Sequence, residues 1–170
     1  LVSAPLRSLD MAALACPPLF ALRWKTYSLA KGTFMADHSP ILNWNLNGRV
    51  ALVTGGARGI GRATCLALAE MGAAVIVHYR SHAQEADAVV EQISARDGKA
   101  LALQSDFAQP AGPQQLVDAV LSSWGQIDIL VNNAGDMPKG AVEEVSDAVL
   151  DYTFTVNLLS AFRCARACLP

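Results

Sequence analysis

Four short apolar runs recur between residues 49 and 135. They are RVALVTGG (49–56), AAVIVHY (73–79), KALALQSD (99–106) and IDILVNNAG (127–135). Each run is apolar at nearly every position rather than at alternate positions, which is typical of a parallel strand covered on both faces. We therefore predict four strands of one buried parallel sheet.

Segments with helical spacing separate these runs, and a glycine lies at the end of each segment. The segments span residues 60–72, 83–98 and 110–125. Glycine commonly ends a helix because it adopts the left-handed conformation at the C-terminal cap, and Pro113 suits a first helical turn. A shorter helix near 142–148 and a final helix over 149–169 are predicted after the fourth run. The alternating order implies right-handed crossovers and an α/β fold with a parallel sheet.

The sequence TGGARGIG (54–61) joins the first predicted strand to the first predicted helix. Gly55 allows a tight turn, Gly59 lets the backbone approach a pyrophosphate, and Gly61 lets the helix pack closely on the strand. The start of the helix adds unpaired N–H groups and a partial positive charge. This stretch therefore predicts a site for the phosphates of a dinucleotide.

The spacing G-x-x-x-G-x-G, together with NNAG after the fourth run, resembles the short-chain dehydrogenase/reductase family from residue 48 to residue 169. The resemblance implies a Rossmann-type three-layer α/β/α fold with strand order 3-2-1-4, truncated after the helix that follows the fourth strand. It also implies hydride transfer between a nicotinamide cofactor and a carbonyl or alcohol. Residues 48–170 would form an incomplete NAD(P)-binding domain, after a leader (1–34) and a linker (35–47).

Matching the family's motifs position by position implies several site residues. The phosphate loop would comprise Gly55, Arg58, Gly59, Ile60 and Gly61. Asp106, with Phe107 after it, matches the acid that follows the third strand and contacts the adenine. The loop that lines the cofactor and holds the central sheet would be Asn133, Ala134 and Gly135. Asn157 matches the catalytic asparagine that kinks its helix and anchors a water in the proton relay.

The stretch VHYRSH at the end of the second run bears on the choice of cofactor. It lacks the Asp or Glu that selects NAD in such folds. Arg80 can pair with a 2′-phosphate and stack on adenine, while Arg58 can reach the same phosphate and Ser81 can add a hydroxyl donor. NADP is therefore favoured over NAD, with Tyr79 as a further contact. The alternative for Arg80 is a solvated loop cation, and the two histidines are expected to frame the loop rather than take part in chemistry.

Composition and charge argue against other classes of protein. The 170 residues are 52% apolar and 16% charged, with a net charge of −2, and show no basic stripe for nucleic acid. The apolar runs are too short to cross a membrane. The four cysteines form no CxxC pair and have no histidines nearby, so no metal site is predicted. A reducing, cytoplasmic compartment fits this pattern.

Residues 1–34 precede the regular pattern and are not expected in the core. They fit either an organelle-targeting segment or an over-extended gene model whose natural start is Met35. Tyr27 and Lys31 stand four apart here, so a helix would place them on one face as a proton-transfer pair. The stretch before them holds two prolines and no serine where a catalytic strand would be needed. We interpret the pair as a coincidence.

The family's catalytic Ser and Tyr-x-x-x-Lys would follow the helix that carries Asn157, and the sequence reaches Pro170 without them. We expect an N-terminal fragment of an NADP-preferring oxidoreductase. Its complete form would act on a small carbonyl or alcohol and would be a homo-oligomer. The alternative is a non-catalytic module that binds NADP or a protein partner. Coding sequence downstream of Pro170 would separate the two interpretations.

Overall fold

The structure is a computed structural model, and it describes residues 45–169. Four parallel strands form one sheet in the order β3-β2-β1-β4. The strands are β1 (Val50–Val53), β2 (Ala74–Tyr79), β3 (Ala100–Gln104) and β4 (Ile129–Val131). The helices are α1 (Gly59–Glu70), α2 (Ala83–Ser94), α3 (Gly112–Trp124), α4 (Asp147–Phe154) and α5 (Ser160–Ala167). The predicted parallel sheet and its order 3-2-1-4 are confirmed.

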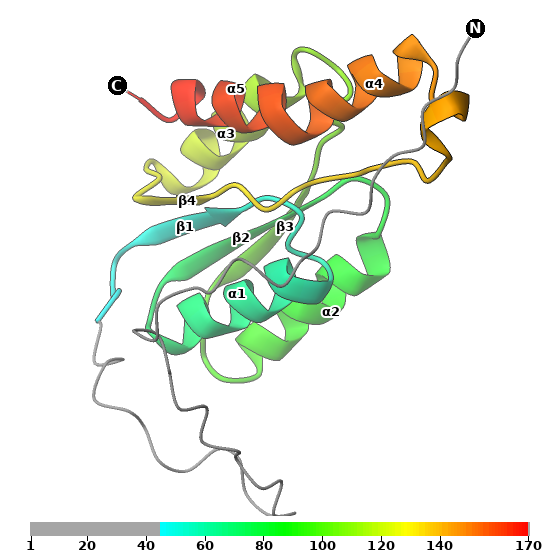
Figure 1. The fold of residues 1–170 in the computed structure, drawn as a ribbon. Coiled ribbons are helices and arrows are strands. Elements are labelled where there is room, and N and C mark those ends of the chain that lie inside the picture. The colour runs from blue at the N-terminus through cyan, green and yellow to red at the C-terminus, as the bar shows by residue number, and fades with distance from the viewer. Residues whose placement is uncertain (1–44, 170) are drawn as a thin grey trace, which may run out of the picture. The chain divides into compact units, whose positions relative to one another are not determined.

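Helices cover both faces of the sheet, with α1 and α2 on one side and α3 and α5 on the other (Figure 1). Side chains alternate between the two faces along each strand, so every strand contributes to two cores. In β1, Ala51 and Val53 join the core under α1 and α2, while Val50 and Leu52 join the core under α3 and α5. This double burial explains why the runs are apolar at nearly every position.

Two helix ends follow the sequence signals closely. Pro113 occupies the first turn of α3, and Gly125 caps its end with a left-handed φ of 76°. The helix α2 ends at Ser94, earlier than the predicted residue 98. The backbone carbonyl of Ile93 there accepts bonds from the amides of Arg96 and Gly98, so a non-helical turn occupies the residues between Ser94 and Gly98.

The last helical region differs from the prediction of one continuous helix over 149–169. It begins at Asp147, because the Ser146 side chain accepts a bond from the Val149 amide and caps the helix. A π-helical turn, Thr155–Leu159, separates α4 from α5. The predicted helix near 142–148 is only a 3₁₀ turn, Val142–Glu144.

The carboxyl ends of β1 and β4 are joined by the buried side chain of Thr54. Its hydroxyl donates to the Val131 carbonyl at 3.2 Å and accepts from the amides of Asn133 and Ala134, both at 2.9 Å. The Asn133 side chain completes the junction by donating to the Thr54 carbonyl at 2.8 Å and to the Gly55 carbonyl at 3.1 Å. The loop after β4 is thereby attached to the start of the glycine loop.

We expect Thr54→Val to lower the free energy of unfolding by about 2–4 kcal/mol, because each buried amide left without an acceptor costs about 1–3 kcal/mol. Urea denaturation would measure the change. Thr64→Val is the matched control, since among the described residues the Thr64 hydroxyl bonds only to the Ile60 carbonyl within α1. The control should stay within about 0.5 kcal/mol of the parent. Similar small losses in both variants would contradict the role given to Thr54.

Candidate functional site

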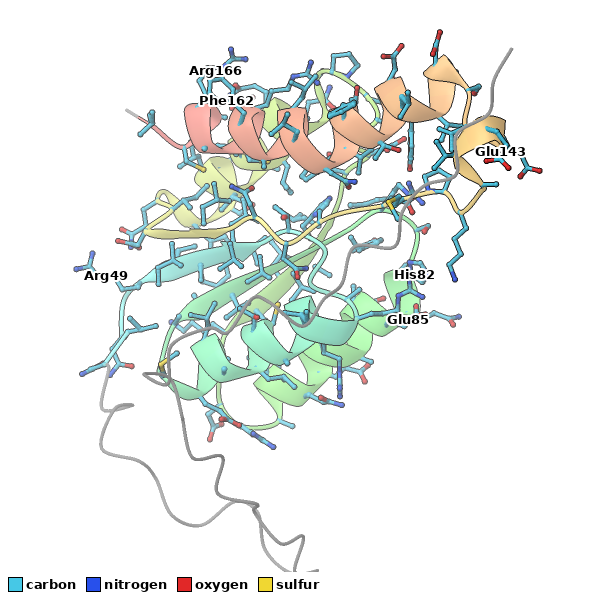
Figure 2. All side chains as sticks on the ribbon, viewed as in Figure 1. Arg49, His82, Glu85, Glu143, Phe162 and Arg166 are labelled. Carbon is cyan, nitrogen blue, oxygen red and sulfur yellow. The ribbon has the colours of Figure 1, made fainter. Side chains whose placement is uncertain are left out.

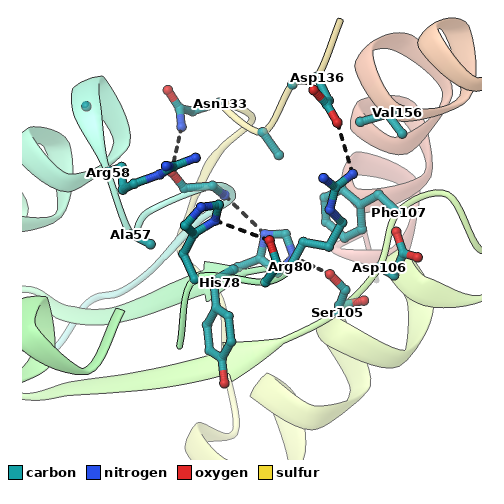
Figure 3. A pocket seen from close by; sticks show the side chains of 17 residues that line it. Ala57, Arg58, His78, Arg80, Ser105, Asp106, Phe107, Asn133, Asp136 and Val156 are labelled. Atoms are coloured by element: carbon teal, nitrogen blue, oxygen red, sulfur yellow. Dashed lines mark hydrogen bonds and ion pairs between the residues drawn. The ribbon is translucent and has the colours of Figure 1, made fainter. Parts of the chain in front are cut away.

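A cavity of about 560 Å³ opens at the carboxyl ends of the strands (Figure 3). Open parallel sheets bind ligands at this edge, where neighbouring strands lead to opposite faces. Of the predicted cofactor residues, these line the cavity: Gly55, Arg58, Gly59, Tyr79, Arg80, Ser81, Asp106, Phe107, Asn133, Ala134 and Gly135. Ile60 and Gly61 lie beside it in the first turn of α1, and the neighbour of Asn157, Val156, also lines it.

Three glycines between the end of β1 and the first turn of α1 have distinct structural reasons. Gly55 has a left-handed φ of 65°. A side chain on Gly61 would overlap the carbonyl of Gly55, so helix and loop pack closely only with glycine there. Gly59 also has a positive φ of 53°, and a Cβ added to it would meet nothing within 4 Å. The loop therefore presents open backbone on the Gly59 side and close packing on the Gly61 side.

The first turn of α1 is suited to binding an anion. Arg58 is its N-terminal cap and makes no side-chain capping bond, and no acidic residue lies in the first turn. The unpaired amides at a helix start carry a partial positive charge. The exposed Arg58 side chain adds a full charge beside them.

His78, at the end of β2, links three segments below the cavity. Its Nδ1 lies 3.1 Å from the Gly55 amide nitrogen and its Nε2 lies 3.1 Å from the Ser105 carbonyl oxygen. An amide can only donate and a carbonyl can only accept, so the ring is neutral with its proton on Nε2. Phe107 stacks on the ring with centroids 4.4 Å apart. Burial lowers the pKa of His78 from 6.5 to about 4, although the bond to Ser105 opposes the shift.

Asp106 and Ser81 are held by local contacts at the rim. Asp106 accepts a bond from the Ala108 amide at 3.0 Å and remains exposed. The Ser81 hydroxyl lies 3.2 Å from Nδ1 of His82. The Asp106 carboxylate and the Ser81 hydroxyl therefore both lie at the cavity, next to the ends of β3 and β2.

Arg80 spans part of the cavity and contacts two residues from other segments. Its Nη1 donates to Oδ2 of Asp136 at 3.0 Å and to the hydroxyl of Tyr152. The Tyr152 hydroxyl donates in turn to Oδ2 of Asp136 at 2.7 Å. The bond from Tyr152, followed by the Arg80 guanidinium, lowers the pKa of the Asp136 carboxyl. Arg80 is thus an ion-paired cation in this structure, and its side chain remains 47% exposed.

Asn157 lies within the π-helical turn and forms hydrogen bonds with the backbone of the loop after β4. Its Oδ1 accepts from the Asp136 amide at 2.8 Å, and its Nδ2 donates to the Asp136 carbonyl at 2.9 Å. Gly135 suits this close approach, since a Cβ there would lie 3.2 Å from Oδ1 of Asn157 and would press against this amide. The amide of Asn157 therefore fixes the position of Asp136.

Sequence reasoning missed three residues that build this site. Thr54 precedes the glycine loop, and its place at the end of a fully buried strand was the signal that could have singled it out. Asp136 follows NNAG directly, but its partner Arg80 is 56 positions away in the sequence. Tyr152 carries no local signal, because its partners become neighbours only when α4 packs at the end of the sheet.

Tyr27 and Lys31 lie outside the described residues. Between residues 45 and 169, no group of three or more His, Cys, Asp or Glu side chains is arranged to hold a metal ion. None of the helices described is both long and apolar enough to cross a membrane.

The family model for short chain dehydrogenases matches residues 49–170. The chain belongs to the short-chain dehydrogenase family. An uncharacterized oxidoreductase of Methylorubrum extorquens is 45% identical to this dehydrogenase chain over 122 residues, which are 72% of the chain and 49% of that relative.

Solved structures agree with the family assignment. A short-chain dehydrogenase from Burkholderia cenocepacia in complex with NADP is 40% identical, with a TM-score of 0.70, over 73% of this chain and 51% of that one. A blue fluorescent protein from a metagenomic library in complex with NADPH is 38% identical, with a TM-score of 0.68, over 73% and 51% of the two chains. The chain spans about half the length of these relatives.

The buried neutral His78 predicts a loss of stability in mild acid. The folded-state pKa of about 4 lies below the unfolded value of 6.5, so the unfolded chain binds the extra proton first. Stability should be complete above about pH 6.5 and decline as the pH falls towards 4. At pH 5 this group alone should remove about 2 kcal/mol relative to pH 7.5.

Urea denaturation at pH 7.5 and pH 5.0 tests this expectation. His78→Gln should be less stable at pH 7.5 and should lose about 2 kcal/mol less on acidification than the parent. His82→Gln is the control, because the ring of His82 bonds only to Ser81 among the described residues. An unchanged pH dependence in His78→Gln would show that this histidine is not the titrating group.

Proposed function

We propose that this chain is the cofactor-binding part of an NADP-preferring oxidoreductase, which transfers hydride between nicotinamide and a carbonyl or alcohol. The observation that supports the proposal is the set of side chains around the cavity. Arg58, Arg80 and Ser81 all line it, and no acid stands where NAD-specific folds place one after β2. The relatives from Burkholderia cenocepacia and the metagenomic library, which are in complex with NADP and NADPH, support the same choice.

The residues present fit a bound dinucleotide. The open backbone at Gly59 and the uncapped start of α1 suit a pyrophosphate. Asp106 and Phe107 would lie at the adenine, with Tyr79 beside them at the end of β2. Asn133, Ala134 and Gly135 would line the remainder of the dinucleotide. The cofactor, when bound, supplies the hydride chemistry, and these residues bind and orient it.

Asn157 would serve the catalytic half of the site. Its amide bonds to both backbone groups of Asp136, so it fixes the loop that borders the cavity. We propose that in a complete form it also anchors a water of the proton relay. The substrate of that complete form would be a small carbonyl or alcohol.

We also propose that a complete form is a homo-oligomer, with the outer face of α4 and α5 between subunits. Large apolar side chains are exposed along this face: Leu150, Phe154, Leu158, Leu159, Phe162 and Leu169. Figure 2 shows Phe162 and Arg166 on the outer side of α5.

The cofactor preference is testable by binding. NADPH should bind more tightly than NADH, and Arg80→Asp should shift the preference towards NADH by about 1–3 kcal/mol, the range for hydrogen bonds to charged groups. This corresponds to a change of about 5- to 150-fold in the ratio of Kd values. Fluorescence or NMR titrations would measure both constants.

Arg96→Asp is the matched control, because Arg96 pairs with Glu70 away from the cavity lining. It introduces the same change of charge and should leave the ratio nearly unchanged. Equal affinities for the two cofactors in the parent and in Arg80→Asp would overturn the proposed preference.

For activity, we expect the 170-residue chain to oxidise no NADPH with carbonyl substrates. A positioned general acid is worth about 10²–10⁴-fold in rate, and residues 158–170 contain no Tyr-x-x-x-Lys to supply one. Tyr27→Phe should change nothing. Turnover by the purified chain that this substitution abolishes would contradict our interpretation of Tyr27 and Lys31.

The alternative, a non-catalytic module, rests on the exposed apolar face of α4 and α5. A transcript that encodes a Ser and a Tyr-x-x-x-Lys downstream of Pro170 would favour the oxidoreductase. A stop codon at that point in the genome would favour the module.

A further inference from the structure

The contact between Arg80 and Asp136 joins the two sides of the dinucleotide crevice. Arg80 follows β2 and Asp136 follows β4, while β1 lies between these strands in the sheet order β3-β2-β1-β4. The ion pair therefore passes over the carboxyl end of β1, where the glycine loop begins. Figure 3 shows the Arg80 side chain extended towards Asp136, and both residues line the cavity.

Tyr152 turns this pair into a closed set of three contacts. Its hydroxyl accepts from Nη1 of Arg80 and donates to the same Asp136 oxygen that Arg80 contacts. The backbone of Asp136 is in turn held by the amide of Asn157. The Asp136 carboxylate is therefore held in place by Tyr152 of α4 and by Asn157 of the π-helical turn. Neither residue belongs to β2 or to the glycine loop.

We propose that Arg80, Asp136 and Tyr152 form a strap across the crevice, which any dinucleotide must open before it binds. This inference rests on the proposed function, because it concerns the same cavity. Opening releases the Arg80 guanidinium. NADP then offers its 2′-phosphate as a new partner, whereas NAD leaves the guanidinium to solvent.

The exposure of the strap makes such an exchange feasible. The side chains of Arg80 and Asp136 are 47% and 41% exposed. Ion pairs at this exposure contribute little free energy, so a phosphate can replace the carboxylate. Asp136 also places a negative charge beside the path of the cofactor phosphates. The strap should therefore weaken the binding of both cofactors by a similar factor.

The test measures Kd for NADP⁺ and NAD⁺ by NMR titration, which detects weak binding, with the full 170-residue chain. Asp136→Ala should bind both cofactors about two- to fivefold more tightly, with the ratio between them preserved. Tyr152→Phe should give a smaller gain of the same kind. Glu91→Gln is the charge control on α2, outside the cavity, and should leave both constants unchanged.

Arg80→Gln separates the strap from the cofactor preference. It opens the strap and also removes the proposed partner of the 2′-phosphate, so NAD⁺ should bind more tightly and NADP⁺ more weakly. Circular dichroism and thermal melting would confirm that each variant is folded.

The outcomes distinguish the two proposals. In one outcome, the parent binds NADP⁺ no better than NAD⁺ while Asp136→Ala still lowers the Kd for NAD⁺. That result would overturn the proposed NADP preference and would support the strap. Unchanged constants in folded Asp136→Ala and Tyr152→Phe would overturn the strap alone. No binding of either cofactor by any variant would overturn both.

Discussion

All four strands end at the same edge of the sheet. The backbone N–H and C=O groups just beyond the strand ends must therefore find hydrogen-bond partners outside the sheet, and side chains supply these partners. Thr54 and Asn133 form hydrogen bonds with the backbone groups where β1 and β4 end. His78 bonds to the Gly55 amide in the glycine loop and to the Ser105 carbonyl after β3. Buried backbone groups without partners are costly, so these few side chains stabilise the loops that line the cavity.

The same arrangement explains why the polar residues at the edge tolerate burial. His78 is neutral because one of its neighbours can only donate and the other can only accept. The thiol of Cys65 lies beneath the loop, 3.8 Å from the Gly56 carbonyl oxygen. Burial raises its pKa to about 12. Both groups are therefore uncharged at neutral pH and act in packing, which leaves the charge at the site to the exposed Arg58, Arg80 and Asp106 and to the half-buried Asp136.

The sequence was sufficient for the parts of the fold that depend on local chemistry. Double-sided burial made the strands visible as apolar runs, and the roles expected for Gly55 and Gly61 in the loop match their backbone geometry. The partners of Arg80 could not be predicted, because they depend on how α4 packs and on a residue that follows a different strand. The resemblance implied a kink at Asn157, but not its form as a π-helical turn over Thr155–Leu159. The residues of this turn have ordinary helical spacing in the sequence. Only the hydrogen bonds between Asn157 and the Asp136 backbone set them apart from an α-helix.

That turn also bears on which kinds of mutation the last helical region can accept. Val156, Ser160 and Cys164 are all buried and stand four apart, while the exposed Phe154, Leu158 and Phe162 form a parallel row. In a plain α-helix, rows spaced by four drift around the axis, because one turn takes 3.6 residues. A wider turn offsets part of this drift and keeps both rows aligned. Substitutions within the exposed row leave that alignment intact, but an insertion or deletion of one residue would rotate every later side chain by about 100°. Length, more than composition, is therefore the conserved quantity to expect in this segment.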